Sequence, residues 1–402
     1  MIGATRYSAT WLFFFSCLVA TGFSKPHDYQ VELVQVIFRH GDRTATPYEW
    51  YPNDPYNETI YEPFGRGQLT SRGKARAYNL GQVLKKKYEK LLGEDYSPNV
   101  LFAYSTNVDR TKMSLQLVLA GMYPPKGPFH WSDTVEWMPI PVYHNFDSFD
   151  FLWTAYYCPK FEIIWNNTLA LPSVQKQLKE YSSFIKYLSK TTGLPDDPHM
   201  GARLFEIMHS QKNLGYEYPS WCNDEVYEKL KEISAFRYDV YSYTDQMKRI
   251  AVGPTIRRFL RNIKTNDGQP SPKIYLYGGH DDNVATLMRT HKFTSPNPAR
   301  SPDYSSAFIM EKLRGRDLQT YIRLLYYPGE GDEFQVMQLK NCNKECPLSR
   351  YLKIMRPVLP FGEGTQCLYE EAYQDVKNVI DGYGPGTRSN ILELKYAYQI
   401  GH

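Results

Sequence analysis

The sequence predicts an α/β protein in which a mostly parallel sheet carries helices on both faces, with a smaller, mainly helical domain inserted. Three segments share one design, a short apolar strand followed by a polar turn and a helical pattern. Continuous apolar strands that alternate with helices are typical of a parallel sheet covered on both faces. Between about residues 145 and 243 the strand signals vanish, and aromatic and charged residues recur at helical spacing. We therefore expect an α/β domain over 25–144 and 244–402, interrupted by a helical insertion over 145–243.

The individual elements follow from hydrophobic patterning. The three expected parallel strands cover 31–38, 100–104 and 274–277. The expected helices beside them are 70–90, which Thr70 or Ser71 would cap, 108–119 and 283–289. Segments 174–188 and 224–234 are expected to be helices of the insertion. Strands over 306–313 and 320–327 are expected to form an antiparallel pair.

The composition excludes several classes of protein. The 402 residues include 47 Lys+Arg and 43 Asp+Glu, with a formal charge of +4, and 42% of them are hydrophobic. This globular composition excludes a disordered chain, a collagen-like repeat and a coiled coil. The charge is too small to indicate nucleic-acid binding, and the run Lys85-Lys86-Lys87 is typical of a solvated helix face. We expect no nucleic-acid partner.

The first 24 residues have the pattern of a cleaved secretory signal peptide. Arg6 precedes an apolar stretch over 11–20, and small residues follow it. The stretch is too short to span a bilayer, no second apolar run of spanning length occurs, and the tail 392–402 is too polar for an anchor. We expect a secreted, extracellular protein without a membrane anchor. Sequons at Asn57 and Asn166 agree with export and are candidate glycosylation sites.

Secretion changes the meaning of the six cysteines. Cys17 would leave with the signal peptide, and an odd number of five would leave at least one thiol free or paired between chains. Cys342 and Cys346 could form half of a zinc site, but no second half with suitable spacing follows. In an oxidising compartment a local disulfide is favoured.

Polar residues follow all three parallel strands, at the sheet edge where open α/β sheets bind ligands. Arginine forks bind phosphate oxygens bidentately, and helix amino ends add amide donors and a favourable dipole. The candidate site residues are Arg39, His40, Arg43, Arg110, His280 and Asp281. We expect them to surround one tetrahedral dianion.

A histidine among such cations is a candidate nucleophile. Neighbouring positive charges favour the neutral imidazole, which can attack phosphorus and split a difficult transfer into two steps. The departing alcohol needs a proton, which Asp281 could donate. Because an ordinary Asp pKa is about 3.9, this donation works best under mildly acidic conditions. Asp282 is a competing acid or helix cap that the spacing does not exclude.

The motifs around these residues resemble those of the histidine acid phosphatases, the branch of the histidine phosphatase superfamily that includes prostatic and lysosomal acid phosphatases. The matching segments are 39–44 (RHGDRT), 105–111 (STNVDRT) and His280-Asp281, in the expected order. Similarity extends over about residues 31–367. Segments 109–119, 123–125 and 339–348 look closest to the insect venom-type acid phosphatases.

The resemblance implies hydrolysis of phosphate monoesters through a phosphohistidine on His40, with Asp281 as the proton donor and no metal or organic cofactor. The residues that would bind the phosphoryl oxygens are Arg39, Arg43, Arg110 and His280. The family fold, an α/β domain with a smaller helical domain, agrees with the architecture expected from patterning.

The resemblance also implies two disulfides, Cys158–Cys367 and Cys342–Cys346. A third disulfide of the family lacks its cysteines here, because Ala307 stands at one place and Met208-His209 near the other. Cys222 is then left over. It is either a buried free thiol or an intermolecular link in a homodimer.

The favoured function is a secreted acid phosphatase of broad specificity. A narrower phosphatase, of the phytase or lysophospholipid phosphatase type, would differ in its pocket walls, and a non-catalytic secreted binding glycoprotein would keep the fold without turnover. The intact set of His40, three arginines and Asp281 argues against the non-catalytic alternative. Several aromatic residues favour aromatic phosphates, although core packing explains many of them equally well: Tyr48, Trp50, Tyr51, Phe149 and Trp153. The other histidines show no metal-ligand spacing and are expected to be incidental, among them His130, His144, His199, His209 and His291.

Overall fold

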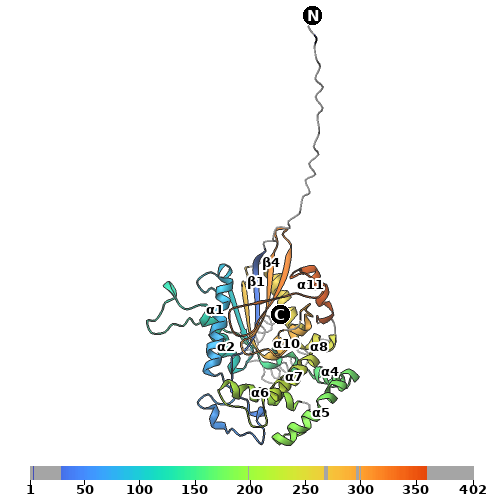
Figure 1. Cartoon of the computed structure of the whole chain (residues 1–402). Coiled ribbons are helices and arrows are strands. Elements are labelled where there is room, and N and C mark those ends of the chain that lie inside the picture. The colour runs from blue at the N-terminus through green and yellow to red at the C-terminus, as the bar shows by residue number, and fades with distance from the viewer. Residues whose placement is uncertain are drawn as a thin grey trace, which may run out of the picture.

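The structure is a computed structural model, and it describes Gly3 and residues 29–359 apart from 198, 267–269, 296–297 and 299. The predicted signal peptide and Cys367 lie outside the described residues. Within them, seven strands form one mixed sheet with the order β2-β3-β1-β4-β5-β6, and β7 pairs with β5 (Figure 1). The strands are β1 (Gln30–Arg39), β2 (Leu101–Ser105), β3 (Ile274–Gly279), β4 (Ala307–Arg314), β5 (Thr320–Tyr327), β6 (Gln335–Met337) and β7 (Glu345–Pro347).

The three strands predicted to be parallel are neighbours. β3 lies between β1 and β2 and pairs in parallel with both, and Ile274 is the register partner of Val34 on one side and of Leu101 on the other. β4 adds antiparallel to β1, and the predicted antiparallel pair is confirmed as β4 and β5. The carboxyl ends of β1, β2 and β3 therefore meet at one edge of the sheet.

Helices cover both faces of the sheet, as the fold class predicts (Figure 1). Because successive side chains of a strand point to opposite faces, Val34 and Val36 enter one core cluster while Leu33 and Ile37 enter another. The first cluster packs against α1 (Ser71–Leu92) and α2 (Asp109–Met122). The second packs against α9 (Gly253–Asn266), α10 (Asp281–Thr290) and α11 (Leu348–Met355).

The helix that follows β1 begins where the sequence predicts. The Thr70 hydroxyl accepts a hydrogen bond from the Gly73 amide at 3.1 Å, which satisfies one of the free donors of the first turn of α1. Thr70 also donates its own amide to the Asp42 carbonyl at 2.9 Å. The start of α1 is thus bonded to the loop that carries the first site motif.

Residues 145–243, hereafter the helical segment, contain no strand among the residues that are described. Its helices are α3 (Thr154–Tyr157), α4 (Pro159–Leu169), α5 (Pro172–Thr192), α6 (Met200–Asn213) and α7 (Asp224–Tyr241). One core cluster joins Leu188 and Phe205 of this segment to Tyr51 and Tyr61, which follow β1 in the chain. The helical segment is therefore packed against the chain that leaves the end of β1. Its status as a separate domain stays a prediction.

The cysteines divide as follows. The disulfide Cys342–Cys346 is confirmed, with Cα atoms 5.5 Å apart. The predicted disulfide Cys158–Cys367 includes a residue outside the described ones. Cys222 is buried and free, and burial raises the pKa of its thiol to about 12. These properties favour a buried thiol over an intermolecular link.

Both sequons lie at the surface of the molecule. Asn57 and Asn166 are both exposed, although glycosylation itself stays a prediction. In the described part of the chain, every helix is too short or too polar to cross a membrane.

We expect Leu276→Ala to lower the free energy of unfolding by about 2–5 kcal/mol, because the side chain is fully buried on the central strand β3 and its removal leaves a cavity. The measurement is urea denaturation followed by circular dichroism. The matched control is Ile163→Ala on α4, where the side chain is 63% exposed and the expected loss is below about 0.5 kcal/mol. Equal losses in the two variants would contradict the assignment of β3 to the core.

Candidate active site

A cavity of about 420 Å³ lies where the predicted site residues meet. Five of the six candidates line it, His40, Arg43, Arg110, His280 and Asp281. The sixth, Arg39, is buried beside the cavity and contacts Glu206, which lines it. Residues about 240 positions apart in the chain are therefore brought into one crevice.

The backbone around His40 is held by both neighbouring strands and by α1 and α2. The His40 amide donates to the Gly279 carbonyl at the end of β3, at 3.1 Å, and the Gly41 amide donates to Ser114 Oγ of α2 at 3.0 Å. A Cβ atom on Gly41 would lie 2.2 Å from the Gly73 carbonyl oxygen in the first turn of α1. This close approach explains why glycine follows His40.

The hydrogen bonds of His40 define its tautomer. Nε2 lies 3.1 Å from Nε of Arg110, and a guanidinium can only donate, so Nε2 must carry a lone pair. Nδ1 lies 2.8 Å from the Gly41 carbonyl oxygen and must therefore carry the hydrogen. Burial, reinforced by the positive charges of Arg110 and Arg39, holds the pKa of His40 well below its usual range. His40 is a neutral imidazole with its Nε2 lone pair on the side of Arg110.

His280 lies beside His40, with ring centroids 5.6 Å apart. Its Nε2 is 3.0 Å from the Thr106 hydroxyl at the end of β2. Burial and the charge of Arg110 hold the pKa of His280 well below its usual range, so this ring is neutral as well. The Asn283 side chain accepts a hydrogen bond from the His280 amide at 2.9 Å and fixes the start of α10. His280 can therefore act as a neutral hydrogen-bonding group beside the nucleophile candidate.

Buried carboxylates hold two of the arginines. Arg43 forms a two-pronged pair with Glu49, with nitrogen–oxygen distances of 2.6 and 2.9 Å. One oxygen of Glu206 accepts from Arg39 at 3.0 Å and from Arg43 at 3.1 Å. The Nε–H groups of Arg39 and Arg43 are buried and find no partner among the described residues. Each arginine thus retains an unused donor that a phosphate oxygen could satisfy.

The two neighbouring carboxyl groups at the start of α10 differ in their electrostatics. Tyr238 donates a hydrogen bond to Asp281 Oδ2, and an Arg237 nitrogen lies 3.6 Å from the same oxygen. Burial raises the pKa of Asp281, but the charges of Arg39 and Arg237 and the Tyr238 bond outweigh it and hold the pKa well below its usual range. Burial and the charge of Asp281 instead raise the pKa of Asp282 to about 6. Both line the cavity, so geometry leaves the choice between them open.

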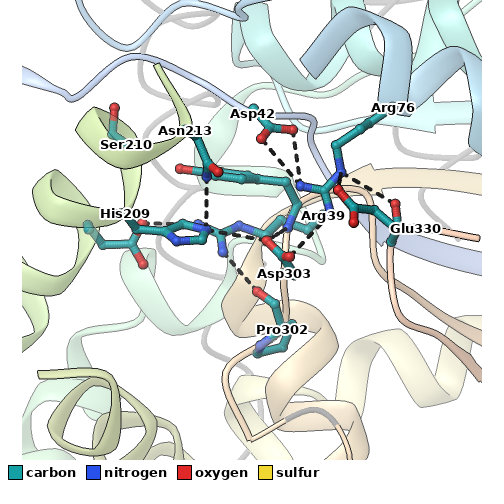
Figure 2. Close-up of polar contacts among 12 residues, drawn as sticks. Arg39, Asp42, Arg76, His209, Ser210, Asn213, Pro302, Asp303 and Glu330 are labelled. Atoms are coloured by element: carbon teal, nitrogen blue, oxygen red, sulfur yellow. Dashed lines mark hydrogen bonds and ion pairs between the residues drawn. The ribbon is translucent and has the colours of Figure 1, made fainter. Parts of the chain in front are cut away.

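Arg39 is also held by contacts with residues that precede β4 in the chain (Figure 2). The Pro302 carbonyl accepts a hydrogen bond from Arg39 at 2.8 Å, and the guanidinium lies 4.2 Å from the centroid of the Tyr304 ring. The neighbouring Asp303 contacts His209 of α6 at 3.3 Å and Arg76 of α1 at 3.2 Å. Figure 2 shows this carboxylate between the two side chains.

Several residues of the site are not predicted from the sequence. Glu206, Arg237 and Tyr238 come from α6 and α7 of the helical segment, and His199 lines the cavity although it was expected to be incidental. The sequence carries one signal for Glu206, since it interrupts the apolar run Leu204–Met208. Arg237 carries no such signal, because it looks like an ordinary surface charge on a helix. Of the aromatic candidates, Tyr48 and Trp153 line the cavity, whereas Tyr51 is fully buried in the core.

The chemistry of the site suits an anion more than a metal ion. Within the described ranges, no group of three or more His, Cys, Asp or Glu side chains is arranged to hold a metal. The unused guanidinium donors point instead to a ligand with several oxygen acceptors.

Comparison with known proteins agrees with this chemistry. Residues 30–327 match the histidine phosphatase superfamily (branch 2). The venom acid phosphatase Acph-1 of Apis mellifera is 32% identical over 348 residues, 84% of this chain and 88% of that protein. The prostatic acid phosphatase of Bos taurus has the same identity and coverage, and the human lysosomal acid phosphatase is 27% identical over 87% of this chain and 83% of its own.

Solved structures with the same fold include bacterial phytases. The Hafnia alvei phytase in complex with tartrate has a TM-score of 0.65 and 16% identity, and covers 86% of this chain and 100% of its own. The phytase of Citrobacter braakii has a TM-score of 0.62 and 17% identity, and covers 82% and 98%. At this identity the likeness shows the fold alone.

We expect His40 to be neutral, with its hydrogen on Nδ1, at the ordinary histidine pKa of about 6.5 and above it, because burial and Arg110 lower its pKa. The measurement is the pair of ring nitrogen chemical shifts in ¹⁵N NMR, with His40→Gln used to assign the signals. A His40 ring that gains a proton near pH 6.5, or a hydrogen on Nε2, would contradict the geometry described here.

Proposed function

Since the chain belongs to branch 2 of the histidine phosphatase superfamily and to its acid phosphatase family, we propose that it hydrolyses phosphate monoesters through a phosphohistidine on His40. The observation that carries this proposal is the Nε2 lone pair of a neutral His40 beside three guanidinium groups. This lone pair accepts the hydrogen bond of Arg110 Nε–H in the free site, so it can attack phosphorus once Arg110 transfers that hydrogen bond to a phosphoryl oxygen.

In the first step, His40 Nε2 forms a bond to phosphorus while the bond from phosphorus to the alcohol oxygen breaks. The Nδ1 hydrogen stays bonded to the Gly41 carbonyl and helps to carry the positive charge that develops on the ring. Arg39, Arg43 and Arg110 bind the phosphoryl oxygens, and their fixed charges stabilise the transition state without reorganisation. His280 would add a hydrogen bond to the same group.

In the second step, water attacks phosphorus and the bond to Nε2 breaks, which regenerates neutral His40 and releases inorganic phosphate. We assign the proton transfers in both steps to Asp281, which would relay the substrate's proton to the departing alcohol, then accept the proton of water and pass it to the phosphate that leaves. Because Arg39 and Arg237 favour the ionised form of Asp281, the proton must arrive with the substrate. A phosphate ester has its second pKa near 6, so below that pH its monoanion brings this proton. The need for a substrate that carries its own proton explains why we expect activity at acidic pH.

The cavity walls favour a phosphate monoester with an uncharged, flat leaving group and allow broad specificity. Trp153 and Tyr156 pack against each other at 4.7 Å between ring centroids and line one wall, and Tyr48 lines the cavity with 68% of its surface exposed. The lining contains four arginines and five carboxyl groups. This near balance of charge disfavours a highly anionic polyphosphate, and with it the phytase alternative.

Secretion to the extracellular space is part of the proposal. The apolar stretch over 11–20 and the disulfide Cys342–Cys346 support it, and proteins named as venom and prostatic acid phosphatases are among the relatives. Expression of the whole chain in a eukaryotic host tests it, since the protein should accumulate in the medium and shift in size on removal of N-glycans.

We expect His40→Ala to lower kcat on p-nitrophenyl phosphate at pH 5 by at least about 1,000-fold, because covalent catalysis is lost. The matched control is His130→Ala, an exposed histidine outside the cavity, which should keep full activity. The wild type should be most active below pH 7. Undiminished turnover by His40→Ala would refute the mechanism, and a wild type without turnover would favour the non-catalytic glycoprotein.

We expect Asp281→Asn to slow hydrolysis of an alkyl phosphate about 100-fold more than that of p-nitrophenyl phosphate, because p-nitrophenolate leaves without protonation. Asp282→Asn is the matched control, since it neutralises the neighbouring carboxyl group. Steady-state kinetics on both substrates measure the difference. Equal losses on both substrates for Asp281→Asn would assign it to binding, and a selective loss in Asp282→Asn would move the acid to that residue.

A further inference from the structure

One carboxylate oxygen lies between two of the arginines that we assign to phosphate binding. Glu206 Oε2 accepts from Nη2 of Arg39 at 3.0 Å and from Nη2 of Arg43 at 3.1 Å. Glu206 lines the cavity on α6, and its side chain is only 9% exposed. An internal anion therefore bridges two buried cations of the candidate phosphate site.

The hydrogen bond from Arg43 to Glu206 occupies the Nε–Nη2 edge of the guanidinium, which is the edge that a phosphate would bind. Nη1 and Nη2 of Arg43 donate to the two oxygens of Glu49, which occupies the end of the fork. The other hydrogen of Nη2 lies on the same edge as Nε–H, and this is the hydrogen available to Glu206. The Nε–H has no partner among the described residues. A phosphate that binds side-on through Nε and Nη2 must therefore take over the donor that Glu206 uses.

The two carboxylates differ in how firmly they are held. Glu49 accepts from both terminal nitrogens of Arg43 and also from the Thr46 amide at 2.7 Å. Glu206 Oε1 is buried and finds no partner in the part of the chain that the structure describes. The Glu206 carboxylate is thus held through one oxygen, by the same two arginines that phosphate would engage. Glu206 can yield its position to an incoming anion, whereas Glu49 remains in place.

We propose that Glu206 competes with phosphate for Arg39 and Arg43 and thereby weakens binding of the inorganic phosphate product. This role rests on the proposed function and deepens it. Without Glu206, departure of the product would leave the buried Arg39 without a bonded carboxylate among the described residues and Arg43 with Glu49 alone, which is costly in a low-dielectric site. The Glu206 carboxylate supplies the counter-charge as the product leaves, so it acts through the arginines as a positioning residue. It lowers the affinity for phosphate and speeds product release, a step that limits kcat in many enzymes.

The test is the inhibition constant of inorganic phosphate against p-nitrophenyl phosphate in Glu206→Gln, which keeps the size of the side chain and removes its charge. We expect both this constant and KM to fall by about tenfold without a rise in kcat, because a negative charge near the bound phosphate anion is removed. Structural damage would weaken phosphate binding instead. The matched control is Glu180→Gln on the exposed face of α5, which should change neither constant. A folded Glu206→Gln variant with unchanged or weaker phosphate binding would overturn the proposal.

A second measurement uses the wild type and does not depend on the stability of a variant. In a crystal structure with inorganic phosphate bound, we expect a phosphate oxygen on Nη2 of Arg43 and no bond from that nitrogen to Glu206. A bound phosphate together with an intact Glu206 bridge would overturn the proposal.

Failure of the proposed function is distinguishable from failure of this role. If the wild type shows no turnover, the proposed function fails, and calorimetric titration of wild type and Glu206→Gln with inorganic phosphate still measures the competition. If the wild type turns over but Glu206→Gln does not gain affinity, only the role of Glu206 fails.

Discussion

The structure depends on the concentration of positive charge around one neutral imidazole. Arg39 and Arg43 are almost fully buried, and Arg110 donates directly to His40 Nε2. Buried cations are costly without counter-charges, so the fold must supply carboxylates that satisfy the arginines without neutralising the site. Glu49 and Glu206 bond only the terminal nitrogens and leave both Nε–H groups without partners among the described residues. The buried arginines are thus compensated by carboxylates and still have the Nε–H donors with which they could bind an anion.

The parallel arrangement of β1, β2 and β3 makes this concentration possible. Each strand delivers its polar residues at the same edge of the sheet, and α2 and α10 begin there, so that Arg110 and Asp281 line the crevice. The close approach of Gly41 to Gly73 places the loop after β1 against the first turn of α1, and His40 and Arg43 of this loop line the cavity. The α/β part of the chain therefore provides the proposed nucleophile and most of the positive charge.

Much of this arrangement is predictable from the sequence, because strand ends and caps are local features. In the structure, β1 ends one residue and β3 two residues beyond the ends that the apolar pattern predicts, because Arg39 and Gly279 still pair across the sheet. The contribution of α6 and α7 is not predictable in this way. Helical spacing indicates which residues share a face but not which distant groups that face meets, so the contacts of Glu206 and Tyr238 appear only in three dimensions. The protonation states of Asp281 and Asp282 are not predictable from the sequence either, because they depend on contacts with Arg39, Arg237 and Tyr238 rather than on spacing.

The helical segment consequently does more than form a wall for the leaving group. It provides Tyr238 and Arg237, which favour the ionised form of Asp281, and Glu206, which bridges the arginines. His209 on the same helix as Glu206 also contacts Asp303 of the α/β part. A displacement of α6 would therefore change the arginine geometry and the contact with Asp303 at the same time. Trp153 and Tyr156, which we propose to contact the leaving group, belong to the same helical segment as Glu206, Arg237 and Tyr238, so a displacement of that segment would change specificity and catalysis together.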